Sequence, residues 1–172
     1  MKLLVIDIQK GITDSRLFNF EAFIKDTTRI IKAARDNQIE VIYFQHDDGS
    51  GTGFSVGDED FEIAEQVMPK DGERIFIKNI NSCFGNKDFT DYIKDDSTLM
   101  IVGLQTNFCI DATVKSAFER GYKVIVPQGA NSTFDNDYMT GEETYKYYND
   151  MMWPKRFATC VSVDEAIKMM ES

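Results

Sequence analysis

The sequence predicts an α/β protein, a three-layer αβα sandwich built on a Rossmann-like, mostly parallel six-stranded sheet. Short apolar runs of four to seven residues recur along the chain, and segments with helical spacing of apolar residues separate them. Runs that are apolar on both faces are typical of parallel strands covered by helices on both sides. With no internal repeat or linker in its 172 residues, the chain is expected to form a single domain over 1–172.

The elements are expected in alternating order. The strands are the apolar runs at 2–7, 39–45, 74–77, 99–102, 123–126 and 157–161. The helices are expected at 20–37, 61–67, 86–93, 110–121, 140–152 and 163–170. Gly103 is expected to end the fourth strand, and Gly121 to end the helix that follows it. Ser162 is an N-cap residue type at the start of the last helix.

The composition excludes several classes of partner. The formal net charge is −10, which argues against nucleic acid and anionic membranes. No apolar run approaches the roughly 20 residues of a membrane-spanning helix, and Asp7 interrupts an N-terminal run too short for a signal peptide. Three widely spaced cysteines do not suggest a disulfide framework, so a reducing, cytoplasmic location is expected.

Cys109 lies where the fourth strand turns into a helix. Thr106 and Asn107 are N-cap residue types, and the apolar residues after Cys109 recur at helical spacing. Free backbone N–H groups and the positive end of the helix dipole favour a thiolate in a first turn, as a cysteine nucleophile requires. The alternative is a small apolar residue that packs the turn, and position alone does not decide between the two.

Three reactive side chains follow strands that should share one edge of the sheet. Asp7 follows the first strand, Lys78 the third, and Cys109 the fourth. Ligands bind at this carboxyl edge in such folds. Asp7 is a candidate general base for the thiol, and Lys78 would keep Asp7 ionised and stabilise the thiolate. A turn-forming aspartate and a solvated lysine are the alternatives.

Three motif blocks stand in order along the chain. They are VIDIQ at 5–9, Lys78 followed by Ser82 and Phe84, and GLQTNFCIDAT at 103–113. These blocks resemble the isochorismatase-like cysteine hydrolases, which include nicotinamidases, N-carbamoylsarcosine amidases and ureidoacrylate amidohydrolases. The resemblance runs over nearly the whole chain, but it says little about the substrate.

The resemblance implies a catalytic triad of Asp7, Lys78 and Cys109. It also implies a cis peptide bond between Leu104 and Gln105, which would aim the N–H groups of Gln105 and Cys109 at one point as an oxyanion hole. The implied reaction is attack of the thiolate on a small-molecule carbonyl, release of an amine, and hydrolysis of the thioester. A homodimer or larger homo-oligomer is implied as well.

The remaining pocket residues are expected in the loops beside this triad. Asn81, Phe84, Gln105 and Phe108 are candidate substrate-binding residues, and His46 opens a loop expected to face the substrate. His46 is the single histidine, so the extra histidine ligands of the nicotinamidase metal site are absent, and no metal is expected. The glycine-rich stretch GSGTG at 49–53 follows the second strand rather than the first and opens no helix, so neither a nucleotide nor another cofactor is expected.

The sequence therefore predicts a cysteine-dependent hydrolase that cleaves a C–N bond of a small amide, ureido or carbamoyl compound. The first alternative is isochorismate-type hydrolysis of a vinyl ether, chemistry that does not need the thiol of Cys109. The second is a ligand-binding member of the fold that keeps the triad without turnover. Whether the loops at 47–58 and 131–140 close over the site stays open.

Overall fold

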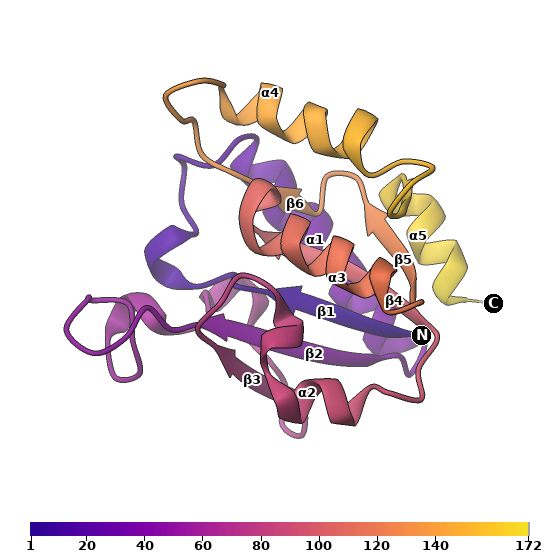
Figure 1. Ribbon diagram of the computed structural model, residues 1–172, viewed down its shortest axis with the longest axis horizontal. Coiled ribbons are helices and arrows are strands. Elements are labelled where there is room, and N and C mark those ends of the chain that lie inside the picture. The colour runs from indigo at the N-terminus through magenta and orange to yellow at the C-terminus, as the bar shows by residue number, and fades with distance from the viewer. Residues whose placement is uncertain (172) are drawn as a thin grey trace.

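A parallel β-sheet runs through the middle of the molecule, and helices cover both of its faces (Figure 1). The computed structural model describes residues 1–171. The strands are β1 (Lys2–Ile6), β2 (Glu40–His46), β3 (Arg74–Lys78), β4 (Thr98–Leu104), β5 (Lys123–Pro127), β6 (Asn131–Ser132) and β7 (Thr159–Val161). They are ordered β3-β2-β1-β4-β5-β7, β6 pairs with β4, and every pairing between them is parallel. This architecture confirms the predicted α/β class.

Two apolar layers pack against the two faces of the sheet. The helices are α1 (Phe20–Asp36), α2 (Lys87–Tyr92), α3 (Asp111–Glu119), α4 (Gly141–Lys146) and α5 (Val163–Met170). Leu3 and Val5 of β1 share one core cluster with residues of α1 and α5. Leu4 and Ile6 point to the opposite face and pack with residues of α2 and α3. This alternation along a strand buried on both sides explains the continuous apolar runs.

The sheet has seven strands, so the prediction of six was wrong. The additional strand is β6, which lies in a segment expected to be a loop and pairs Asn131 and Ser132 with Gly103 and Leu104. A strand of two residues is too short to give an apolar run, so periodicity does not detect it.

Gly103 continues strand β4, although it was expected to break it. Its backbone has φ +126°, and a Cβ there would lie 2.0 Å from the carbonyl oxygen of Ile6. The glycine therefore allows β1 and β4 to approach closely at their carboxyl ends. This is the edge of the sheet from which Asp7 and Cys109 project.

Several helix ends follow the sequence signals. The Ser162 hydroxyl accepts a hydrogen bond from the backbone of Glu165, whose side chain accepts from Ser162 in return, so α5 begins with a capping box. Gly121 follows α3 with φ +87°. The helix expected at 61–67 is instead two 3₁₀ turns, and the one expected at 140–152 is α4 followed by a π-helical turn from Tyr147.

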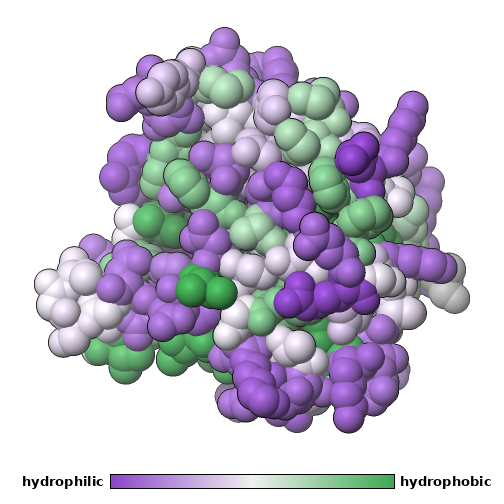
Figure 2. Space-filling view, in the orientation of Figure 1, coloured by the Kyte–Doolittle hydropathy of each residue, from purple (hydrophilic) through white to green (hydrophobic). Residues whose placement is uncertain are grey.

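The surface is mixed in character. Figure 2 shows one face on which hydrophilic side chains are interspersed with smaller hydrophobic areas. Within residues 1–171, no helix combines the length and the apolar character that crossing a bilayer requires.

Candidate active site

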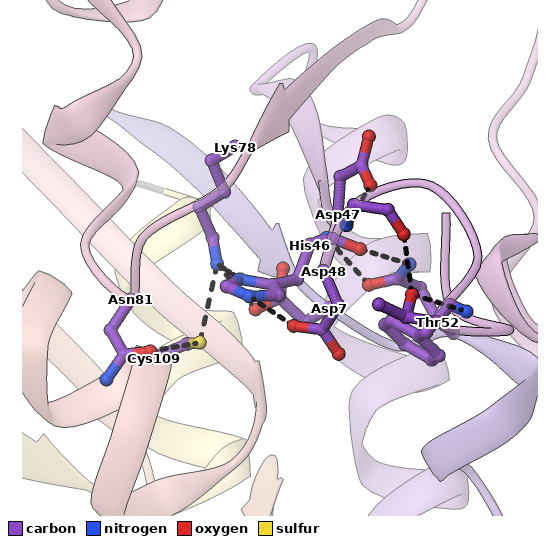
Figure 3. Close-up of polar contacts among 11 residues, drawn as sticks. Asp7, His46, Asp47, Asp48, Thr52, Lys78, Asn81 and Cys109 are labelled. Atoms are coloured by element: carbon purple, nitrogen blue, oxygen red, sulfur yellow. Dashed lines mark hydrogen bonds and ion pairs between the residues drawn. The ribbon is translucent and has the colours of Figure 1, made fainter. Parts of the chain in front are cut away.

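The structure brings Asp7, Lys78 and Cys109 together at the carboxyl edge of the sheet. Asp7 directly follows β1 and has φ +52°, a left-handed conformation that is uncommon for a residue other than glycine. Lys78 is the last residue of β3, and Cys109 lies in the turn between β4 and α3. Because the strands lie in the order β3-β2-β1-β4, the three side chains converge from the carboxyl ends of β3, β1 and β4 (Figure 3).

The ammonium group of Lys78 is the centre of this cluster. Its Nζ lies 2.7 Å from Asp7 Oδ2, 3.3 Å from Cys109 Sγ and 3.1 Å from His46 Nδ1. The Lys78 side chain has no exposed surface, and that of Asp7 is 2% exposed. An ammonium offers three donors, and each of these three partners takes one of them.

The contact with Lys78 also assigns the protons of His46. An ammonium cannot accept a hydrogen bond, so His46 Nδ1 must be the acceptor and Nε2 must carry the ring proton. The Nε2 atom lies 3.1 Å from Asp48 Oδ1. His46 therefore bridges the buried ammonium and the half-exposed carboxylate of Asp48.

Burial sets the protonation states of the cluster. It raises the pKa of the Asp7 carboxyl, against the opposing charge of Lys78. It acts to lower the pKa of Lys78, but the opposing charge of Asp7 leads the interactions that outweigh burial and leave that pKa raised. Burial, and then the charge of Asp7, raise the pKa of Cys109 to about 12. Burial and the neighbouring carboxylate thus oppose the thiolate that a position in a first helical turn favours.

One oxygen of Asp7 is available to take the proton of that thiol. Asp7 Oδ1 is buried and has no hydrogen-bond partner among the described residues, whereas Oδ2 accepts from Lys78. An unpartnered buried carboxylate oxygen is energetically unfavourable and needs an explanation. A side chain that exchanges a proton during a reaction provides one.

The same cluster does not fit a metal ion. Asp7, His46 and Cys109 offer ligand atoms within 4.8 Å of one another. However, the Lys78 ammonium contacts all three side chains and occupies the cation's place among them. A divalent cation there would meet a fixed like charge.

The turn that carries Cys109 is held by the neighbouring segment at 131–133. The peptide bond between Leu104 and Gln105 is cis, and residues 106–110 form a π-helical turn. Thr106 donates its hydroxyl proton to Asn131 Oδ1 at 2.7 Å, and Thr133 donates to Asn107 Oδ1 at 2.6 Å. Thr106 and Asn107 therefore bond across the chain instead of capping the helix, and that expectation was wrong. Sequence reasoning assigned no role in the site to Asn131 or Thr133, because no local pattern marks such contacts.

A pocket of about 270 Å³ opens beside the thiol. It is lined by Asp7, Ile12, His46, Asp48, Phe54, Asn81, Gln105, Phe108 and Cys109. Asn81 Oδ1 lies 3.8 Å from Cys109 Sγ, and Phe108 is 52% exposed at the pocket. The structure thus gathers most of the candidate substrate-binding residues.

The structure does not bring Phe84 to this pocket. The ring of Phe84 is buried and packs against Phe89 and Tyr122, with centroids 5.4 and 5.7 Å away. The 3₁₀ turn Cys83–Gly85 directs this ring into the core between the sheet and helices α2 and α3. Ile12, Asp48 and Phe54 line the pocket, although they were not among the candidate substrate-binding residues. Asp48 and Phe54 could have been found from the sequence, because they lie in the loop that begins at His46 and was expected to face the substrate.

Comparison with known proteins agrees with this fold. An isochorismatase family protein of known crystal structure is 26% identical in sequence to this chain. The two structures have a TM-score of 0.84 over 94% of this chain and 97% of that one. A cysteine hydrolase from Pseudomonas syringae pv. phaseolicola 1448A has a TM-score of 0.89 over 99% and 92% of the two chains, at 22% identity. The protein thus has the parallel α/β fold of isochorismatase-like proteins.

The sequence comparisons name the family. A family model described as the isochorismatase domain matches residues 2–165. The uncharacterized isochorismatase family protein YddQ of Bacillus subtilis is 30% identical over 76% of this chain and 77% of its own length. A streptothricin hydrolase of Streptomyces noursei is 26% identical over 77% of this chain, which spans 54% of that enzyme. The chain belongs to the isochorismatase family.

Proposed function

We propose that this protein hydrolyses a C–N bond of a small amide, ureido or carbamoyl compound, with Cys109 as the nucleophile. The observation that carries the proposal is the position of the Lys78 ammonium, which lies 2.7 Å from Asp7 and 3.3 Å from Cys109. A base, a nucleophile and a cation in mutual contact beside a pocket form an activated nucleophile. A relative named streptothricin hydrolase supports the hydrolytic class.

In the first half of the reaction, Asp7 Oδ1 takes the proton of the Cys109 thiol. The sulfur attacks the substrate carbonyl, and the charge of Lys78 stabilises the thiolate as it forms. Asp7 then returns the proton to the substrate nitrogen, so that the C–N bond breaks and the amine or ammonia leaves. The raised pKa of Asp7 makes it a better proton acceptor than an ordinary carboxylate.

In the second half, water enters and gives up a proton to Asp7. The hydroxide attacks the thioester carbonyl, the C–S bond breaks, and the sulfur recovers the proton from Asp7. The acid product then leaves, a carboxylic acid from an amide or a carbamic acid from a carbamoyl group, and the cluster returns to its starting state. Each tetrahedral intermediate carries an oxyanion, for which the N–H groups of Gln105 and Cys109 are the proposed donors.

The test is ammonia release from a panel of small primary amides and ureido compounds, with mass spectrometry of the protein during turnover. The unmodified protein should hydrolyse a member of the panel and carry an acyl adduct on the peptide of Cys109. Cys109→Ala should lose the activity by at least about 10³-fold, because the nucleophile is gone. Cys160→Ala is the matched control and should retain it, since Cys160 lies in β7 away from the cluster.

Two results would contradict this function. Full activity of Cys109→Ala on the same amide would remove Cys109 from the reaction. Pyruvate release from isochorismate that persists after alkylation of Cys109 would favour vinyl-ether hydrolysis. With either result, the buried cluster would need another role.

A further inference from the structure

The charged side chains that line the candidate active-site pocket are both negative. Of the nine residues within 1–171 that line it, Asp7 and Asp48 are carboxylates, and none is lysine or arginine. The buried Lys78 is not part of the lining. Its three N–H donors are taken by the lining residues Asp7, His46 and Cys109. The pocket therefore offers no cationic side chain of its own to a bound anion.

Asp48 is held at the pocket by contacts on both its side chain and its backbone. Its Oδ1 lies 3.1 Å from His46 Nε2, and its backbone N–H donates to the carbonyl oxygen of Phe54 at 3.0 Å. The Asp48 side chain is 54% exposed, so its charge faces solvent and entering ligands. A His46 that carries its proton on Nε2 gives Asp48 a hydrogen bond but does not neutralise its charge.

The other polar groups of the pocket are neutral. Asn81 and Gln105 present carboxamides, each of which both donates and accepts hydrogen bonds. Ile12, Phe54 and Phe108 supply apolar wall. Such a lining matches a small molecule with an amide-like polar group and an uncharged or positively charged body.

We propose that this pocket selects amides that are neutral or positively charged near the scissile bond and rejects those that carry a carboxylate there, with Asp48 as the specificity-determining residue. The inference rests on the proposed function and narrows its substrate class. An anion would lose water beside the Asp48 charge without gaining a counter-charge. The net charge of −10 opposes anions at longer range as well.

The test compares two alkylating reagents of nearly the same shape at Cys109. Iodoacetamide is neutral and iodoacetate is an anion, so their rate ratio reports charge selection without a known substrate. The ratio at the Cys109 peptide is measured by mass spectrometry on the native protein and on the urea-unfolded protein, which corrects for intrinsic reactivity. We expect the ratio of the iodoacetamide rate to the iodoacetate rate to be about tenfold higher in the native protein than in the unfolded chain. High salt should reduce this difference, because it arises from Coulomb repulsion of the anion.

Three variants separate charge from shape. Asp48→Asn should bring the rate ratio of the native protein close to that of the unfolded chain. Asp48→Glu should keep the higher ratio, because the charge remains. Glu59→Gln is the matched control: it removes one charge from the same acidic stretch but lies outside the pocket lining, so the ratio should not change. Far-UV circular dichroism verifies that each variant is folded.

The outcomes distinguish this inference from the proposed function. Equal ratios in the native and unfolded protein, with Cys109 labelled by both reagents, would overturn charge selection and leave the nucleophile intact. A higher native ratio that persists in Asp48→Asn would overturn the role of Asp48. A native Cys109 that resists both reagents while Cys160 reacts would contradict an accessible nucleophile, and with it both proposals.

Discussion

The two ends of the sheet carry two hollows of different character. At the carboxyl ends lies the pocket of about 270 Å³ beside Cys109. At the amino ends of β4, β5 and β7 lies a groove of about 570 Å³, lined mainly by aromatic and aliphatic side chains together with Lys123 and Arg156. The groove is the larger, but the pocket holds the buried charges, the thiol and the unpartnered carboxylate oxygen.

The difference shows that converging chemistry, rather than size, marks a candidate site. The buried Asp7–Lys78 pair has lost its hydration, and its attraction compensates for that loss only in good geometry. Such a pair is weak evidence for stability and therefore points to function. In the groove, Phe118 and Phe157 stack edge to face at 5.4 Å, an arrangement that packing alone explains.

The largest effect is expected from removal of Lys78, the buried cation beside the pocket. Lys78→Met leaves Asp7 buried without its partner and should abolish detectable amide hydrolysis. It should also lower the free energy of unfolding by about 3 kcal/mol, a loss limited because Asp7 can take up a proton. Urea denaturation and ammonia release measure the two effects.

Lys87→Met is the matched control for that substitution. Lys87 also pairs with an aspartate, Asp91, but on the exposed surface of α2. Its removal should leave both the unfolding midpoint and the activity unchanged. Equal behaviour of the two variants would contradict the assignment of a special role to the buried pair.

A smaller effect is expected where β1 and β4 approach each other. In Gly103→Ala, the new Cβ would meet the Ile6 carbonyl oxygen at 2.0 Å, so the two strands must separate. We expect a loss of about 3 kcal/mol in the free energy of unfolding, together with reduced activity, because Asp7 and Cys109 move apart.

Gly121→Ala is the comparison, measured by the same urea titration. Gly121 also has positive φ, +87°, but nothing lies within 4 Å of an added Cβ. Only backbone strain remains, so a loss of about 1 kcal/mol and unchanged activity are expected. Similar losses for both variants would show that close approach of the strands does not matter.

The smallest effect is expected in the amino-end groove. The double variant Lys123→Ala, Arg156→Ala removes both lysine and arginine side chains of the groove without touching the pocket. Its kcat/KM for the amide identified above should stay within about twofold of the unmodified protein. A larger change would show that the two ends of the sheet are coupled and would weaken the contrast between them.

Much of the fold could be predicted from local patterns. Continuous apolar runs and helical spacing gave the alternation of strands and helices because burial on both faces leaves a direct mark on the sequence. Ser162 and Gly121 likewise mark helix ends by residue type. The two-residue strand β6 was missed because its pairing depends on Gly103 and Leu104, which are distant in sequence.

The site could be predicted in part. Asp7, Lys78 and Cys109 were found because each follows a predicted strand, and parallel strands present their carboxyl ends at one edge. The direction in which Phe84 points was not predictable, because it depends on a turn packed against α2 and α3. The cytoplasmic location and the homo-oligomeric state stay predictions.

The sequence by itself determined the class of fold, the edge of the sheet that holds the reactive residues and the family resemblance. Each of these depends on residue types at short spacing, which local physical rules connect to structure. Only the tertiary structure decided that burial disfavours the Cys109 thiolate, that His46 links Lys78 to Asp48, and that no cationic side chain among residues 1–171 lines the pocket. Protonation and charge depend on burial and on neighbours from separate strands, which come together only when the chain is folded.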